Sequence, residues 1–277
     1  MIRNFAKCFA VTAALLAPSA YAQVSCTRAG LQAAADLYVA AQKSGDTSKM
    51  PLAMGLGYWE NHQVTPIANG LIKKAMKVDH VRSLIDTSTC QTFTEVIVTD
   101  KAAPYVLGTR MRVNHGLIAE IETLWTTTGY WLFNADDYLK WSSTEKWDTI
   151  SAAQRDTRGT LEAAASAYLD AFLEGKMDLV PWGQPCNRTE GGGMHTGKGA
   201  PDDSCQVGVP MGVNISDRRY VVDETIGSVV VYCRFGVNGS PDTHLFRVEN
   251  GKLRYVHTLT HLLQSNFQGN AKGKGKQ

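Results

Sequence analysis

The sequence contains the same ordered set of segments twice, and this repetition limits the fold more than any other feature. The segment Arg28–Tyr38 (RAGLQAAADLY) returns about 130 residues later as Arg158–Tyr168 (RGTLEAAASAY). Two shorter matches follow in the same order, Arg82–Asp86 with Arg219–Asp223 and Val113–Ile118 with Val248–Leu253. Ordered matches at nearly one spacing indicate duplication of a unit of roughly 115 to 130 residues, an ordinary domain size. The chain is therefore expected to fold as two similar units.

The two ends of the chain are expected to lie outside these units. Residues 1–22 combine basic Arg3 and Lys7, an apolar run and a small-residue site at Ala20–Ala22, which is the pattern of a secretory signal peptide. The apolar run is too short for a membrane span, and no other stretch reaches the ~18 apolar residues that such a helix needs. We expect an exported protein, periplasmic or extracellular, with a first domain at 23–150, a second at 151–268 and a flexible basic tail at 269–277.

The charge balance gives no sign of a polymeric or membrane partner. The chain has 28 Lys and Arg against 26 Asp and Glu, and two of the basic residues lie in the signal segment. No basic stripe with interleaved aromatic residues points to nucleic acid. We expect a small-molecule ligand or substrate, no nucleic acid, no membrane, and a monomer whose two units form an internal pseudo-dimer.

In an exported protein we expect the cysteines to oxidise to disulfides. Beyond the signal segment five cysteines remain, so at least one must be unpaired. Cys26 opens the first helix and Cys90 precedes a strand of the same unit, while Cys186 and Cys205 bracket a glycine-rich loop in the second; each of these pairings stays inside one unit. Cys233 is left over in the apolar run 229–233 and is interpreted as a buried, inert thiol.

Each unit begins with a predicted amphipathic helix and continues as strands. Apolar residues recur at helical spacing from Leu31 and from Leu161, and Gly45 and Gly175 end the two helices. Strands are predicted over 91–98 and 104–113 in the first unit and over 228–235 and 243–248 in the second. A helix followed by an antiparallel sheet is an α+β plan.

The last hairpin can be predicted in register. Asn250-Gly251 is a strong two-residue turn signal that pairs Glu249 with Lys252. Continued outward, this register places Val248 opposite Leu253, Phe246 opposite Tyr255, and His244 opposite His257. The two histidines would then share one face of the sheet.

Several of these segments resemble known families. The helix, the Glu60-Asn61 step, the Arg-x-x-x-Asp strand and the closing hairpin resemble the nuclear transport factor 2-like, or SnoaL-like, α+β cone. The stretches 78–86, 155–158, 219–224 and 244–258 resemble a group of secreted, mostly fungal proteins with a domain of unknown function. The resemblance implies a tandem pair of cones, each with a pocket between its helices and the concave face of its sheet. Relatives include cofactor-free cyclases, isomerases, dehydratases and lyases of small, often aromatic molecules, and others are binding or dimerisation modules.

In the first unit the candidate base is His80, whose ordinary pKa lies near neutrality, with Asp86 or Glu60 setting its tautomer. Tyr58, Arg82 and Glu95 are candidate substrate contacts. The alternative for Arg82 and Asp86 is a structural ion pair, since the same Arg-x-x-x-Asp spacing recurs in the second unit without a matching histidine.

In the second unit His244 facing His257 could share a proton or hold a substrate oxygen, with Glu190 and Tyr255 as substrate contacts. The alternative is a partly buried, hydrogen-bonded histidine pair, because the first unit has Thr109 and Glu122 at the matching positions.

No metal or cofactor is expected. His257 and His261 are four residues apart, but in a strand that spacing separates them by about 13 Å. The phosphate-loop spelling Gly192–Lys198 is followed by Gly199 where such a loop needs a hydroxyl residue, and no dinucleotide fingerprint follows a strand. The sequence thus favours a secreted, cofactor-independent lyase or isomerase that acts on a small, aromatic (lignin-derived or polyketide-like) compound by His/acid proton transfer. The alternative is a secreted small-molecule binding or scaffolding protein without catalytic activity.

Overall fold

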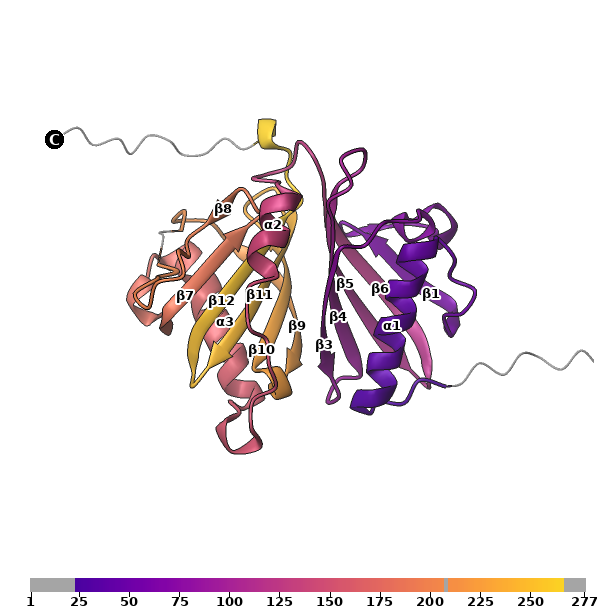
Figure 1. The fold of residues 1–277 in the computed structure, drawn as a ribbon, viewed down its shortest axis with the longest axis horizontal. Coiled ribbons are helices and arrows are strands. Elements are labelled where there is room, and N and C mark those ends of the chain that lie inside the picture. The colour runs from indigo at the N-terminus through magenta and orange to yellow at the C-terminus, as the bar shows by residue number, and fades with distance from the viewer. Residues whose placement is uncertain (1–22, 207–208, 267–277) are drawn as a thin grey trace, which may run out of the picture.

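A computed structural model describes residues 23–206 and 209–266 and shows two units of the same plan side by side (Figure 1). The predicted signal segment 1–22 and tail 269–277 lie outside the described residues. In the first unit, the elements are α1 (Arg28–Ser44), β1 (Leu52–Glu60), β2 (Gln63–Val64), two 3₁₀ turns (Ile67–Asn69 and Leu71–Lys73), β3 (His80–Asp86), β4 (Gln91–Val98), β5 (Tyr105–Asn114) and β6 (Leu117–Thr126).

A connecting segment with α2 (Ala135–Ser142) and a 3₁₀ turn (Ala152–Gln154) leads into the second unit. This unit has α3 (Arg158–Glu174), β7 (Trp182–Glu190), β8 (Met194–His195), β9 (Ile215–Asp223), β10 (Ser228–Phe235), β11 (Ser240–Glu249) and β12 (Lys252–Thr260), with 3₁₀ turns at Met177–Leu179, Glu224–Ile226 and Gln264–Asn266. The sheet orders, β2-β1-β6-β5-β4-β3 and β8-β7-β12-β11-β10-β9, are the same in both units. The expected tandem α+β fold is confirmed, although the sheets are mixed rather than antiparallel, because β1 pairs with β6 and β7 with β12 in parallel.

The two long helices begin and end by the same local chemistry. The side chain of Thr27 accepts a hydrogen bond from the Gly30 backbone N–H, and Thr157 does the same for Thr160. Gly45 and Gly175, at φ 72° and 68°, end the helices in the left-handed conformation that glycine adopts without steric cost. The predicted helix ends are therefore confirmed.

The layers run helix, sheet, sheet, helix. α1 packs on the outer face of the first sheet, and α3 packs on the outer face of the second. Between the sheets lies a third core that includes Leu84, Phe93, Tyr232 and Leu245, to which α2 adds Tyr138. The two units are thus joined by a buried apolar interface inside one chain.

A reciprocal exchange of ion pairs locks the units together. Arg28 of the first unit binds Asp223 of the second (Nη1 to Oδ1 2.8 Å), and Arg158 of the second binds Asp86 of the first (Nη1 to Oδ1 2.9 Å). Both carboxylates also accept a backbone N–H from the other unit, from Ile85 and Val222. The predicted Arg82–Asp86 ion pair is therefore wrong: Asp86 is held by Arg158 and Arg82 by Glu95, because the duplicated motifs pair across the sheets.

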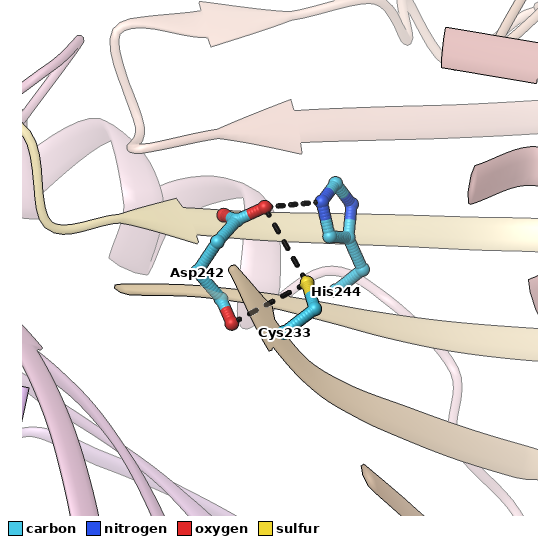
Figure 2. Close-up of side chains that lie close together, drawn as sticks. All are labelled: Cys233, Asp242 and His244. Carbon is cyan, nitrogen blue, oxygen red and sulfur yellow. Dashed lines mark hydrogen bonds and ion pairs between the residues drawn. The ribbon is translucent and has the colours of Figure 1, made fainter. Parts of the chain in front are cut away.

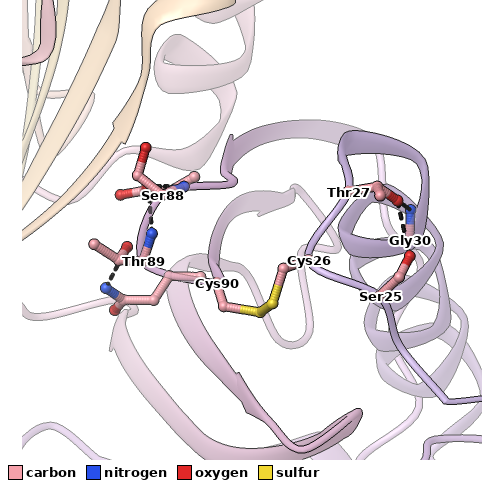
Figure 3. The surroundings of a disulfide bond; sticks show 9 residues. Ser25, Cys26, Thr27, Gly30, Ser88, Thr89 and Cys90 are labelled. Carbon is pink, nitrogen blue, oxygen red and sulfur yellow. Dashed lines mark hydrogen bonds between the residues drawn. A yellow bond between two sulfur atoms is a disulfide. The ribbon is translucent and has the colours of Figure 1, made fainter.

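Both expected disulfides are present. Cys26–Cys90 joins the start of α1 to the turn between β3 and β4, beside Ser88 and Thr89 (Figure 3), and Cys186–Cys205 ties β7 to the following loop. Cys233 is free and buried, as predicted.

The β11–β12 hairpin departs from its predicted register. Asn250 and Gly251 both have positive φ and pair Glu249 with Lys252, as expected. A bulge between Arg247 and Val248 then shifts the register by one residue, so that His244 lies opposite Thr258, Leu245 opposite His257, and Phe246 opposite Val256. The predicted Phe246–Tyr255 and His244–His257 pairs are therefore wrong. Since a slip of one residue exchanges the faces of a strand, His244 points toward α3 and His257 toward the first sheet.

Candidate functional site

A polar group lies inside the second unit, between α3 and its sheet. His244 Nε2 is 2.7 Å from Asp242 Oδ2, and Thr260 Oγ1 donates to Asp242 Oδ1 at 2.9 Å. Cys233 Sγ lies 3.6 Å from the same Asp242 oxygen (Figure 2). Asp242 is fully buried and His244 is only 2% exposed. A carboxylate on one ring nitrogen fixes the imidazole tautomer, which leaves the other nitrogen, Nδ1, as an acceptor.

The thiol of Cys233 is the third member of this group. Burial raises its pKa well above the ordinary value, and the neighbouring Asp242 raises it further, so the thiol stays protonated and donates to Asp242. The ligand atoms of Cys233, Asp242 and His244 lie within 4.8 Å of one another, close enough to hold a metal ion. Within the described residues, these three side chains are the candidate metal ligands, so the expectation that the protein binds no metal is to be tested here.

Four buried polar atoms around this group have no hydrogen-bond partner within the described residues. They are Tyr168 Oη on α3, Arg188 Nε on β7, Thr258 Oγ1 on β12 and His244 Nδ1 on β11. Burial raises the pKa of Tyr168 to about 12 against the lowering influence of Arg188, so its hydroxyl is a neutral donor at pH 7. Buried polar atoms are normally satisfied in native proteins. Such a cluster can therefore donate to and accept from a bound guest.

A cavity of about 180 Å³ adjoins the polar group. Arg188 and Thr260 belong both to the polar group and to the cavity wall, and Arg188 Nη2 binds Glu190 at 2.6 Å. The remaining lining residues are Trp131, Phe172, Met194, Pro210, Phe235 and Leu262. A cavity of about 150 Å³ accepts a benzene molecule, so this one has the size of a single substituted ring.

The first unit provides an internal comparison for this site. Strand pairing makes Asp242 a neighbour of Cys233 and Thr260, and the equivalent neighbours in the first unit are Val96, Leu107 and Trp125. The pair His244 and Thr258 corresponds to Thr109 and Thr123. There Tyr38, the counterpart of Tyr168, bonds Thr109 at 2.6 Å, and Thr109 bonds Thr123 at 2.9 Å. The fold therefore forms without the Cys/Asp/His group.

The first-unit candidates have structural contacts. Tyr58 donates to Glu60 at 2.6 Å, Glu60 also accepts the backbone N–H of Leu71, and the Tyr58 ring fills the space beside Gly70. In the described chain, no hydrogen bond or ion pair joins His80 to Glu60 or Asp86, so the predicted tautomer-setting contact is wrong. Glu60 and Asp86 are held instead by the 3₁₀ turn and by Arg158.

The other predicted residues meet in a buried ionic network between the sheets. His257 Nδ1 lies 3.0 Å from Glu95 and Nε2 lies 2.8 Å from Glu145, while Arg82 binds Glu95 at 2.7 Å and Tyr138 donates to Glu95 at 2.8 Å. Burial alone would lower the pKa of His257, but Glu145 and Glu95 raise it to about 9. Burial alone would raise the pKa of Glu95, but His257 and Arg82 lower it to about 2.

His80 and Tyr255 lie beside this ionic network. Burial lowers the pKa of His80, Arg82 lowers it further, and its Nε2 has no hydrogen-bond partner in the part of the chain that the structure describes. Tyr255 stacks on Trp147 at 5.6 Å and accepts the Lys146 backbone N–H. Four candidates, His80, Arg82, Glu95 and His257, are thus brought together, but across the unit interface rather than inside one cone.

Five residues of the second-unit site were not among the predicted site residues: Asp242, Tyr168, Arg188, Thr258 and Thr260. Asp242 could have been found, because Asp-x-His in a strand puts both side chains on one face. Tyr168 was interpreted only as part of the apolar helix face, and Arg188 lies in a strand that was not predicted.

A model of a family described as Domain of unknown function (DUF8021) matches residues 154–260, which is the second unit. No curated protein matches the chain.

Three solved structures illustrate the structural matches. A protein from Jannaschia sp. CCS1, provisionally designated a SnoaL-like polyketide cyclase, aligns at 14% identity and TM-score 0.28, covering 38% of this chain and 90% of its own. An NTF-2 like protein of unknown function from Burkholderia xenovorans LB400 aligns at 14% identity and TM-score 0.30, covering 38% and 84%. An ntf2-like protein from Bacteroides fragilis NCTC 9343 aligns at 11% identity and TM-score 0.21, covering 86% and 97%. The strand order and the packing of the helices, and not these matches, define the fold of this chain.

Among the described residues, no helix combines the length and the apolar character needed to cross a bilayer.

Proposed function

We propose that the second unit is the catalytic cone of an exported, cofactor-independent lyase or isomerase that acts on a small aromatic compound by His/acid proton transfer. One observation carries the proposal: the His244–Asp242 pair and the unpartnered Tyr168 and Arg188 donors lie together beside a ring-sized cavity, whereas the first unit has threonine and leucine at the positions of His244 and Asp242. The two disulfides support export.

The proposed reaction uses the buried polar atoms that have no hydrogen-bond partner among the described residues. His244, held by Asp242 through Nε2, takes a proton at Nδ1 from a carbon next to a substrate carbonyl. The C–H electron pair moves to the carbonyl oxygen, which accepts hydrogen bonds from the Tyr168 hydroxyl and Arg188 Nε–H. An isomerase then returns the proton to a different carbon. A lyase instead breaks the bond to a leaving group on the adjacent carbon, forming a double bond.

The binding alternative is supported by a separate feature of the same cavity. His244 and Asp242 are not among its lining residues, and the one ion pair in the wall, Arg188 with Glu190, neutralises itself. A guest held only by the apolar wall and by Thr260 would be bound without conversion.

Solvent deuterium exchange separates the two functions without requiring the natural product to be known. Purified protein is incubated in D₂O with a panel of one-ring ketones, phenols and aryl-propanoids, and each compound is examined by mass spectrometry. Proton transfer predicts a gain of deuterium at the carbon next to the carbonyl, or a changed product. Binding alone predicts a saturable shift of the ligand NMR signals with no deuterium uptake.

Matched variants assign the exchange to the site. His244→Asn should reduce exchange by 10²-fold or more, on the order expected for loss of a general base, whereas His115→Asn should leave it unchanged, because His115 is an exposed turn residue whose counterpart is Asn250. Treatment with a chelator should also leave exchange unchanged. Exchange that persists in His244→Asn would remove the assignment.

A further inference from the structure

The interface between the two sheets has two equivalent ends, one beside Arg82 and His257 and the other beside Arg219 and Glu122. The two ends are covered differently. The connecting segment between β6 and α3 passes over only one end, where Glu145 contacts His257 and Arg82. The matching residues at the opposite end are Glu122 for His257 and Arg219 for Arg82. None of the described residues that line the end at Arg219 belongs to the segment that joins the units, so among them no carboxylate takes the place that Glu145 has at the other end.

A cavity of about 320 Å³ lies at this uncovered end. It is lined by Trp59, His62, Arg110, Glu120, Glu122, Arg219 and Arg234. Its volume is at the lower limit of typical small-molecule pockets, about 300 Å³.

The net charges of the ion-pair networks at the two ends differ by one. At the covered end, the two positive charges of Arg82 and protonated His257 are balanced by two carboxylates, Glu95 and Glu145. At the uncovered end, a connected set of ion pairs joins four arginines to only three carboxylates; its members are Arg110, Arg112, Arg219, Arg234, Glu120, Glu122 and Asp217. One positive charge is therefore not neutralised within this set.

His62 adds unused hydrogen-bonding groups. Its side chain is only 3% exposed, and neither ring nitrogen has a hydrogen-bond partner among residues 23–206 and 209–266; Nε2 lies 3.7 Å from Glu122. Arg219 Nε is also buried without a partner in that part of the chain. Burial lowers the pKa of His62, and Arg219 and Arg234 lower it further against the pull of Glu122. A neutral imidazole can donate one hydrogen bond to an anion.

The glycines at the covered end explain why His62 occurs only at the other. The turn Asn61-His62 corresponds in sequence to Gly191-Gly192, where the connecting segment passes so closely that a Cβ on Gly192 would lie 2.0 Å from the Asn134 carbonyl oxygen. At the uncovered end the His62 side chain stands at the matching position and lines the cavity. The imidazole is thus placed at the cavity rather than on the surface.

We propose that this uncovered end binds a small aromatic carboxylate, with the carboxylate on Arg219 and His62 in the place that Glu145 takes at the covered end, and the ring against Trp59. The site is separate from the second-unit cavity and does not depend on the proposed catalytic function.

Calorimetric titration with benzoate, and with its neutral analogue benzamide, tests this site on the chain without the predicted signal segment 1–22. We expect saturable benzoate binding with a Kd of about 1 mM or tighter and at least tenfold weaker binding of benzamide. Arg219→Gln should weaken benzoate binding by tenfold or more, on the order of one lost charge-assisted hydrogen bond. The control is Arg218→Gln, which removes the same charge from the next residue of β9, where Arg218 pairs with Asp170 outside the cavity.

Two further variants keep the proposal falsifiable if Arg219→Gln fails to fold. His62→Asn should also weaken benzoate binding, because asparagine tolerates the left-handed backbone of this turn (φ 62°) but does not reach as far. Thr260→Trp, which fills the second-unit cavity, should leave benzoate binding intact. Equal affinity for benzamide, equal loss in Arg218→Gln, or loss of binding in Thr260→Trp would each overturn the proposal.

Discussion

The buried network around His257 should make the protein less stable as the pH rises from 7 to 9. The pKa of His257 is about 9 in the folded protein, against 6.5 ordinarily. A raised pKa contributes stability that is fully present below pH 6.5 and is lost as the pH rises through 9. Because each unit of pKa shift corresponds to about 1.4 kcal/mol, the free energy of unfolding should fall by about 2 to 3 kcal/mol between pH 7 and pH 9.

This window separates His257 from four other histidines. Burial lowers the pKa of His62, His80, His195 and His261, so these residues are neutral in both folded and unfolded chains above pH 7. At the acid end the sign reverses: the pKa of Glu95 is lowered to about 2, so its contribution is present above pH 4.5 and is lost as the pH falls toward 2.

Urea unfolding followed by circular dichroism at pH 7 and pH 9 measures the effect in the wild type, in His257→Gln and in the exposed-residue control His115→Gln. His257→Gln should be less stable at pH 7 by about 3 kcal/mol or more, because Glu95 and Glu145 lose their buried partner. Its stability should fall by less than about 1 kcal/mol between pH 7 and pH 9, a remainder that comes from Cys233, whose raised pKa keeps the thiol protonated in the folded chain. The control keeps the wild-type fall.

If His257→Gln does not fold, Glu145→Gln should reduce the fall by removing one of the two carboxylates that hold the proton. A wild-type fall that survives in His257→Gln would refute the reasoning.

Three further outcomes follow from contacts between or within the units. Asp86→Asn should lower the free energy of unfolding by at least about 2 kcal/mol, since it weakens charge-assisted hydrogen bonds to the other unit; a loss below about 0.5 kcal/mol in urea unfolding would contradict this. Cys233→Val should change stability by less than about 1.5 kcal/mol, because Val96 stands at that position in the first unit; thermal unfolding checks it. Replacing Cys26 and Cys90, which are 64 residues apart, should cost about 4 kcal/mol, against about 3 for the Cys186–Cys205 pair at 19 residues. Paired Cys→Ala variants measure the difference, and the reverse order would argue against the loop-entropy explanation.

The parts of the fold that depend on local chemistry could be predicted from the sequence. The helix ends follow from Thr27 and Gly45 and their repeats, and the disulfides follow from cysteines that stay inside one unit. The hairpin turn at Asn250-Gly251 was also predictable, but the bulge beside it was not. The residues at the bulge carry no glycine or proline signal, and the same register shift occurs between Arg112 and Val113 in the first unit.

The partners of the charged residues could not be predicted, because they cross between units. A sequence pattern relates Arg82 to Asp86 along one strand, whereas the folded chain exchanges partners between the two copies, so that Arg158 takes Asp86. Glu145 lies in the connecting segment, which has no counterpart in the repeat. Its position over His257 therefore appears only when the two sheets are packed together.

The two helix-facing interiors differ in how fully their polar atoms are hydrogen-bonded. In the first unit, Tyr38, Thr109 and Thr123 satisfy one another. In the second, the counterparts Tyr168, His244 and Thr258 each have a polar atom without a hydrogen-bond partner in the described chain. Each such buried atom costs about 1 to 3 kcal/mol. The first unit shows that the same fold accommodates a satisfied interior at these positions, so packing alone gives no reason for the unsatisfied one. Under the proposed function a bound guest completes these hydrogen bonds, and it should raise the melting temperature of the wild type more than that of Thr260→Trp.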